Sequence, residues 1–104
     1  MKKIIENNRL SLINEKNEEV GFATFPVFKD GVVIIDHTFV NSEYRGQNLA
    51  YHIVTAVLDY IRENNLKVVA SCPYVIKFLD RNKEKYQDII AVIDEEVTEQ
   101  CKLF

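Results

Sequence analysis

Cysteine, histidine and long apolar runs are all scarce in this 104-residue chain. Its two cysteines are too few for the disulfide framework of a small secreted domain. Together with the two histidines they match no common zinc-binding spacing, so we expect no structural metal. No apolar run is long enough to span a bilayer, and residues 1–6 lack the continuous apolar core of a signal peptide. These absences favour a cytoplasmic protein that uses neither a membrane nor a metal.

Positive charge is also in short supply. The chain has 13 lysines and arginines against 16 aspartates and glutamates, which gives a net charge of −3. An acidic chain is a poor match for the phosphate backbone, so we do not expect nucleic acid as the main partner. Hydrophobic residues make up 47% of the chain, enough for one small core, and no repeat or linker divides it. We therefore expect a single domain over residues 1–104, with its core over residues 9–93 and a flexible acidic tail over residues 94–104.

The first forty residues show the alternation of apolar and polar positions that is typical of β-strands. Asp30-Gly31 is a strong signal for a hairpin turn, and Pro26 predicts a bulge, an edge or the end of a strand. The run that follows is apolar on both faces. This pattern predicts a central strand covered on both sides, with His37 on the same face as Ile35. The expected strands cover residues 9–13, 20–25 and 32–40.

Helical spacing replaces this alternation in the second half of the chain. One broad apolar stripe predicts a long helix, and Asn64-Asn65 is a typical C-terminal stop. The strands on either side of this helix should pair in parallel through a right-handed crossover. The expected fold class is therefore α+β, a mixed and mostly antiparallel sheet with a parallel βαβ unit and two main helices. The elements expected here are a helix over residues 47–63, a strand over residues 67–71, a helix from Pro73 through Asp80 and a last strand over residues 89–93.

The stretch over residues 36–53 joins a strand to a helix through a short polar loop. Unpaired backbone N–H groups and the positive end of the dipole at a helix N-terminus bind anions, phosphates above all. Arg45 adds a cation suited to phosphate, and Gly46, one of only three glycines, lets the backbone approach a ligand closely. The junction therefore favours a phosphate site, although a loop that only connects the strand to the helix would show a similar pattern of residues.

The same stretch resembles the acetyl-CoA-binding signature of the GCN5-related N-acetyltransferase superfamily, which is Gln/Arg-x-x-Gly-x-Gly/Ala between a strand and a helix. Arg45 matches its first position and Ala50 its last, while Asn48 stands where the central glycine is usual. Two further motifs resemble the very small, single-domain branch of the superfamily, a His-Thr-x-Val strand and a Cys-x-Tyr segment. They read here as His37-Thr38-Phe39-Val40 and Cys72-Pro73-Tyr74, and the resemblance extends over residues 9–90.

This resemblance implies a minimal acyl-CoA N-acyltransferase fold and an acetyltransferase activity. The cosubstrate would be acetyl-CoA, with coenzyme A as the product, and the acceptor would be an amine that the sequence does not identify. The resemblance also implies that Tyr74 protonates the departing CoA thiolate. The cofactor-binding residues that it implies are Phe39, Val40, Tyr44, Arg45, Gly46, Gln47, Asn48, Leu49 and Ala50.

Cys72 and His37 are the candidate reactive side chains. Cys72 precedes the proline that predicts a helix start, and a thiol at a helix N-terminus is favoured as the nucleophilic thiolate. The residues alone favour the plainer interpretation, a small buried residue at the end of a strand. The imidazole of His37 can act as a base near neutral pH, or it can bond to the backbone. If the third and fourth strands are parallel neighbours, both residues and the phosphate site meet at one end of the sheet.

Two mechanisms and two other functions stay open. Acetyl transfer can be direct, with His37 or a water as base, or it can pass through Cys72. The chain can instead be a non-catalytic module that binds CoA or acyl-CoA. It can also be an interaction protein, although such a protein has no need for Arg45, His37 and Cys72. A monomer or a weak dimer is expected.

Overall fold

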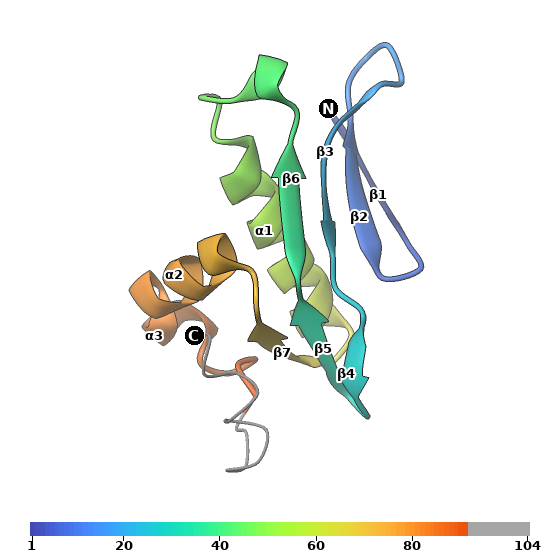
Figure 1. Ribbon diagram of the computed structural model, residues 1–104. Coiled ribbons are helices and arrows are strands. Elements are labelled where there is room, and N and C mark those ends of the chain that lie inside the picture. The colour runs from blue at the N-terminus through green and yellow to red at the C-terminus, as the bar shows by residue number, and fades with distance from the viewer. Residues whose placement is uncertain (92–104) are drawn as a thin grey trace.

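The described part of the chain, residues 1–91 of the computed structural model, combines two sheets with helices (Figure 1). Short turns join most neighbouring elements. The longest helix lies along one face of the strands (Figure 1). In chain order the elements are β1 (Lys2–Glu6), β2 (Arg9–Ile13), β3 (Glu19–Thr24), β4 (Val27–Lys29), β5 (Val32–Ile35), β6 (His37–Val40), η1 (Ser42–Tyr44), α1 (Leu49–Glu63), β7 (Lys67–Ala70), α2 (Pro73–Arg81) and α3 (Lys83–Tyr86).

Strand pairing divides these strands into two sheets. One is a four-stranded antiparallel sheet in the order β1-β2-β3-β6, and the other is a three-stranded sheet in the order β4-β5-β7. β4 and β5 are antiparallel, whereas β5 and β7 are parallel and are connected by way of α1. The predicted α+β class, with one parallel unit in a mostly antiparallel arrangement, is confirmed.

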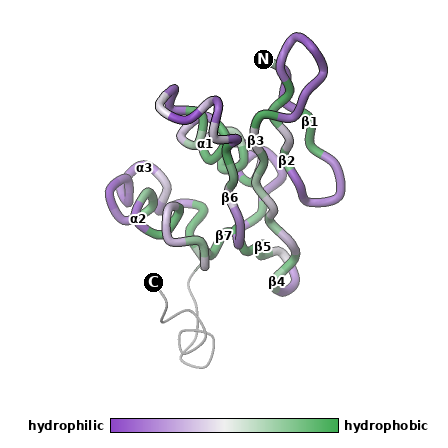
Figure 2. The backbone as a smooth tube through the Cα atoms, turned by 45° about the horizontal axis from the view of Figure 1, so that its top comes forward, coloured by the Kyte–Doolittle hydropathy of each residue, from purple (hydrophilic) through white to green (hydrophobic). Residues whose placement is uncertain are grey.

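The main core lies between α1 and the inner face of the strands. Burying each aliphatic side chain stabilises the fold by roughly 1.5–3 kcal/mol, and α1 contributes a continuous stripe of them. Figure 2 shows hydrophobic colouring along much of the strands and hydrophilic colouring at the turns that join β1, β2 and β3. The buried residues of α1 are Leu49, Ile53, Val54, Val57, Leu58 and Ile61.

The N-terminal strand β1 was not predicted from the sequence pattern. β1 pairs with β2 through a tight turn at Asn7-Asn8, where the two residues have φ angles of 50° and 58°. Two consecutive left-handed residues are typical of a type I′ hairpin turn, and asparagine tolerates this conformation better than most residues. Charged residues, common on an edge strand, obscure the alternation of β1.

The predicted strand over residues 32–40 is divided at Asp36. The backbone N–H of Asp36 donates to the Thr24 carbonyl at 3.3 Å, while His37 is also paired with Thr24. Asp36 and His37 therefore both lie opposite Thr24, as in a β-bulge, and the alternation of side chains between the two faces shifts by one position. Ile35 is fully buried but His37 is exposed, so the prediction that they share a face is wrong. The prediction of a strand covered on both sides holds for β5 and is wrong for β6, an edge of the sheet among the described strands.

Both main helices are confirmed. α1 begins at Leu49 rather than at residue 47, and it ends at Glu63 as predicted. After α1, Asn65 has a left-handed φ of 57°. The Leu66 N–H donates a hydrogen bond to the Ile61 carbonyl at 2.9 Å, as in a Schellman motif. The short helices η1 and α3 were not predicted.

The last predicted strand is described only in part. Within residues 1–91 it consists of a single parallel bridge between Val68 and Ile90. The Ala91 N–H also donates to the Val68 carbonyl at 2.9 Å, so this segment runs beside β7. The rest of the predicted strand and the acidic tail lie outside the described residues.

Candidate functional site

The chain segments that follow β5 and β7 separate where this parallel pair ends, which leaves an opening between them. The Ile35 carbonyl accepts hydrogen bonds from the N–H groups of both Ser71 and Cys72, at 3.1 and 3.2 Å. Beyond this point β6 pairs with β3, while the chain after Cys72 turns away into α2 (Figure 1). Ligands of open α/β sheets bind at such carboxyl ends of parallel strands.

The edge of β6 that faces this opening carries unpaired backbone groups. The Asn41 N–H donates to the Val20 carbonyl of β3 at 2.8 Å, which sets the phase of the antiparallel hydrogen bonds. Because these bonds involve every second residue, the N–H and C=O groups of Thr38 and Val40 point away from β3. No described strand pairs with that edge. An extended ligand can therefore bind there in the manner of an added strand.

Hydrogen bonds hold the loop that follows β6. The side-chain oxygen of Asn41 accepts a bond from the Glu43 N–H at 3.0 Å, so it caps the short helix η1. The Tyr44 hydroxyl accepts a bond from Asn14 Nδ2 at 3.0 Å, which ties η1 to the hairpin between β2 and β3. The loop is thus anchored to the sheet before it reaches α1.

Two left-handed residues then turn the loop into α1. Gly46 has a φ of 88°, and a Cβ at this position would have no atom within 4 Å. The backbone conformation, rather than close packing, therefore accounts for this glycine. Asn48 has φ 59° and ψ 25°, and it stands where the acetyl-CoA signature usually has glycine. Asparagine meets the same conformational requirement, because it is among the few side chains that tolerate the left-handed region.

The N-terminus of α1 is available to an anion. Its N-cap residue, Asn48, makes no side-chain capping hydrogen bond, and its first turn contains no acidic residue. The first N–H groups of this 15-residue helix therefore keep their capacity to donate, and no local charge offsets the positive end of the dipole. Arg45, three residues before the N-cap Asn48, adds a positive charge. Phosphate groups suit this combination of N–H donors and a guanidinium.

A surface hollow of about 260 Å³, here called the loop hollow, joins these features. Every predicted cofactor-binding residue except Phe39 and Gln47 lines it, and α2 contributes Tyr74. Tyr51 lines it as well and was not predicted, although its place in the first turn of α1 was a usable signal. The complete lining is Val40, Tyr44, Arg45, Gly46, Asn48, Leu49, Ala50, Tyr51 and Tyr74.

Tyr74 presents a phenol to this hollow. Its side chain is partly exposed, and its ring stacks on Phe78 with 6.5 Å between the ring centroids. Partial burial raises the pKa of Tyr74 above its ordinary value, Arg81 acts in the opposite direction and Tyr51 adds to the increase. The hydroxyl is therefore protonated at neutral pH, and it can donate a proton or a hydrogen bond.

The two predicted reactive residues lie on opposite faces of the opening. Cys72 is the N-cap of α2, as predicted, and its side chain is 8% exposed within the main core. The bulge at Asp36 instead turns His37 to the outer, exposed face. No hydrogen bond joins the two side chains within residues 1–91. On the inner face the Thr38 hydroxyl is buried, and it has no hydrogen-bond partner in the same part of the chain.

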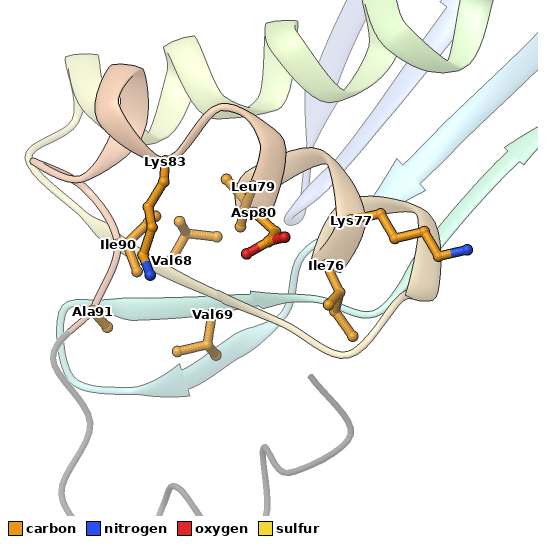
Figure 3. Close-up of a pocket in the computed structure, with 9 residues that line it drawn as sticks. All are labelled: Val68, Val69, Ile76, Lys77, Leu79, Asp80, Lys83, Ile90 and Ala91. Atoms are coloured by element: carbon orange, nitrogen blue, oxygen red, sulfur yellow. The ribbon is translucent and has the colours of Figure 1, made fainter.

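A larger hollow, of about 420 Å³, lies between α2 and β7 (Figure 3). Its walls are mostly aliphatic, with Lys77, Asp80 and Lys83 as charged members, and the ammonium end of Lys77 extends away from it (Figure 3). It extends to Ala91, the last described residue, and the only helix start in its lining is Lys83 of the four-residue α3. The features that suit an anion are therefore found at the loop hollow. The aliphatic lining consists of Val68, Val69, Ile76, Leu79, Ile90 and Ala91.

Two features are absent from the described residues. No three histidine, cysteine, aspartate or glutamate side chains in residues 1–91 are grouped so that they could hold a metal ion. None of the helices in that range is long and apolar enough to cross a membrane.

Comparison with known proteins agrees with this geometry. A family model described as GCN5-related N-acetyl-transferase matches residues 9–89. The chain belongs to the GCN5-related N-acetyltransferase family. Among curated relatives, Protein NATD1 of Bos taurus is 37% identical over 51 residues, which cover 49% of this chain and 45% of that protein. Protein NATD1 of Danio rerio is 38% identical over 50 residues, which cover 48% and 46%. The chain spans about half the length of the curated relatives it matches.

Solved structures confirm the acetyltransferase fold. A GCN5-like protein from Staphylococcus aureus has a TM-score of 0.69 and 28% sequence identity, and the match covers 90% of this chain and 91% of that one. A GNAT family N-acetyltransferase from Escherichia coli, solved in complex with CoA, has a TM-score of 0.55 and 25% identity. That match covers 60% of this chain and 38% of the Escherichia coli protein. The predicted resemblance to the GCN5-related N-acetyltransferases is thus confirmed.

Proposed function

We propose that this chain is an acetyl-CoA-dependent N-acetyltransferase, which transfers an acetyl group from acetyl-CoA to an amine. The observation that carries the proposal is the loop hollow, where the uncapped N-terminus of α1 and Arg45 meet. Membership of the acetyltransferase family supports it, as does the CoA bound to the Escherichia coli relative.

The residues of the opening fit the parts of coenzyme A. The N–H groups at the start of α1 and the guanidinium of Arg45 would neutralise its diphosphate. The free backbone groups of Thr38 and Val40 would bond the amides of its pantetheine chain along the edge of β6. Tyr74 would then lie on the α2 side of the same opening. We therefore assign cofactor contacts to the residues that line the loop hollow.

The two faces of the opening support a division of roles in direct transfer. The acceptor amine would attack the thioester carbonyl, so that a carbon–nitrogen bond forms as the carbon–sulfur bond breaks. His37, on the outer face, would accept the proton that the amine loses. Tyr74, whose raised pKa keeps it protonated, would give its proton to the departing CoA thiolate and regain one from solvent. Acetyl-CoA and the amine would thus approach from opposite faces.

Loss of Cys72 is expected to leave catalysis largely intact. Its thiol is buried on the core side, His37 lies on the other face, and no hydrogen bond within residues 1–91 joins the thiol to a histidine that could activate it for attack. We expect Cys72→Ala to keep at least about one third of the wild-type acetyl-CoA turnover. Intact-protein mass after incubation with acetyl-CoA checks the route. One acetyl group that maps to Cys72, is absent from the variant and is discharged by an added amine would establish transfer through the cysteine instead.

Binding of CoA tests the proposed function first. Free CoA at 100-fold its Kd should stabilise the wild-type protein by about 2.7 kcal/mol, measured as a thermal shift. Arg45→Gln should weaken CoA binding about tenfold, because it removes a charge-assisted contact to the diphosphate. Arg9→Gln is the matched control, because Arg9 is a partly exposed arginine on β2 that pairs with Glu19, and CoA affinity should not change.

Release of CoA from acetyl-CoA in the presence of a panel of amines then tests catalysis. We expect release that depends on the amine and that falls in the Arg45→Gln protein. Binding of CoA without amine-dependent release would point to the non-catalytic CoA-binding module. Absence of a thermal shift at millimolar CoA would contradict both.

A further inference from the structure

The open edge of β1 carries charges of both signs. β1 lies at one end of the four-stranded sheet, so among the described strands it has a partner on one side only. Its sequence, Lys2-Lys3-Ile4-Ile5-Glu6, has two cations at one end and an anion at the other. None of these three charged residues belongs to a salt bridge within residues 1–91. The two ends of the strand are therefore free to attract each other in a second copy.

The backbone groups on this open edge belong to Lys3 and Ile5. The Phe25 N–H donates to the Asn8 carbonyl at 2.9 Å, so every second residue counted from Asn8 bonds to β3, and the residues between them bond to β1. The residue that pairs with Ile4 is one of those between, so the backbone groups of Ile4 point to β2. Those of Lys3 and Ile5, on either side of it, therefore point to the open edge.

One antiparallel register between two copies uses these groups. With a two-fold axis at Ile4, Lys3 of one copy lies opposite Ile5 of the other, and each such pair exchanges two hydrogen bonds. Ile4 then meets its own counterpart, and Lys2 of each copy lies opposite Glu6 of the other. These last pairs are not hydrogen-bonded, and in such pairs the side chains come closest. The same register thus satisfies the backbone and pairs opposite charges.

Charge disfavours the other registers that the backbone allows. An axis at Lys3 would place two lysines opposite each other, which is destabilising. An axis at Ile5 would leave Lys2 and Lys3 without an opposite charge. Charged residues on an edge strand usually prevent pairing with other chains. In β1 the same charges oppose the shifted registers and favour the one centred on Ile4.

The side chain at the proposed axis is apolar and exposed. Ile5 packs against the main core, so its neighbour Ile4 points to the outer face of the sheet. Ile4 is 39% exposed, one of the few large hydrophobic side chains of the described residues that stay exposed. It borders a hollow of about 310 Å³ over β1 and β2. Contact between the two Ile4 side chains would remove apolar surface from water, which favours association.

We propose that two copies of this chain associate through their β1 strands, about a two-fold axis at Ile4. The pairing joins two four-stranded sheets into one. β6 lies at the far end of each sheet, so the loop hollow stays open in both copies and the inference does not rest on the proposed function. A five-residue strand buries less than the roughly 1,200 Å² of a stable interface, so the dimer is weak, with a Kd on the order of 100 µM.

Sedimentation velocity of the full chain tests the proposal. Between about 10 µM and 1 mM the wild type should change from monomer to dimer. Lys2→Glu and Glu6→Lys should each raise the dimer Kd at least about tenfold, because the two-fold axis turns one substitution into two like-charged pairs. Lys29→Glu makes the same charge change at an exposed position on β4, in the other sheet, and it should leave the Kd within about threefold.

Mixing the two β1 variants tests the register and shows that both are folded. In an equimolar mixture of Lys2→Glu and Glu6→Lys every pair of positions 2 and 6 again joins opposite charges, so a heterodimer of near wild-type affinity is expected. The inference is overturned if the wild type stays monomeric at about 1 mM. It is also overturned if the single variants dimerise as the wild type does, or if their mixture forms no heterodimer.

Discussion

Gly21→Val is expected to lower the free energy of unfolding by about 3 kcal/mol, a large share of the stability of a domain of this size. Gly21 lies on β3, paired with Val40 of β6. A Cβ at Gly21 would lie 2.7 Å from Ile53 Cδ1 and 2.7 Å from the Phe39 carbonyl oxygen. The end of the isoleucine side chain can move, but the carbonyl belongs to the backbone of β6. The sheet and α1 must therefore separate to admit any side chain.

Urea denaturation measures this effect, and a second glycine supplies the control. Gly21→Ala should cost about 2 kcal/mol, because its single methyl group already meets both neighbours. Gly31→Ala places the same methyl group in open space at a φ of 77°, so it should cost only about 1 kcal/mol of backbone strain. If both Gly21 variants cost no more than Gly31→Ala, the close approach of α1 and β6 to Gly21 is contradicted.

Asn48→Val is expected to weaken CoA binding about 30-fold, whereas Asn48→Gly should keep the affinity within about threefold. The φ of 59° at Asn48 is open to glycine but strained for a β-branched residue, by about 2 kcal/mol. Relief of that strain requires the loop to leave its left-handed turn. The free N–H groups of α1 and the guanidinium of Arg45 would then no longer line one hollow.

A matched residue at the other end of α1 separates loss of the site from loss of stability. Asn65 has a φ of 57°, so Asn65→Val carries a similar strain far from the loop. Urea denaturation should show a comparable loss of stability in the two valine variants, while calorimetry should show weaker CoA binding only for Asn48→Val. Wild-type affinity in Asn48→Val would contradict the diphosphate site. An equal loss of affinity in both variants would contradict a local effect of the loop.

Features that depend on a few adjacent residues could be predicted from the sequence. The hairpin at Asp30-Gly31, the helix stop at Asn64-Asn65 and the helix start at Pro73 are all found where the pattern placed them. Each depends on the dihedral preferences of one or two residues, which the chain carries wherever it folds. The strand-to-helix loop could also be predicted locally, because a change of hydrophobic period marks it.

Features that depend on distant partners could not be predicted in this way. The bulge at Asp36 arises from a hydrogen bond to Thr24, twelve residues earlier, and no local pattern marks the extra residue. One bulge was enough to move His37 to the other face, because strand side chains alternate with a period of two. β1 was missed because its pairing with β2, rather than its own alternation, makes it a strand.

The order of most elements, the strand-to-helix loop and the resemblance to the acetyltransferases could all be predicted from the sequence, since each resides in a short contiguous stretch. Which side chains lie close together depended on the tertiary structure. The parallel pairing of β5 with β7 brings α2, and with it Tyr74, beside the start of α1. The same pairing, with the bulge, places Cys72 and His37 on opposite faces. Local dihedral preferences determine where helices, strands and turns form. Burial of the apolar stripe of α1 and hydrogen bonds between distant strands determine which of these elements pack against one another.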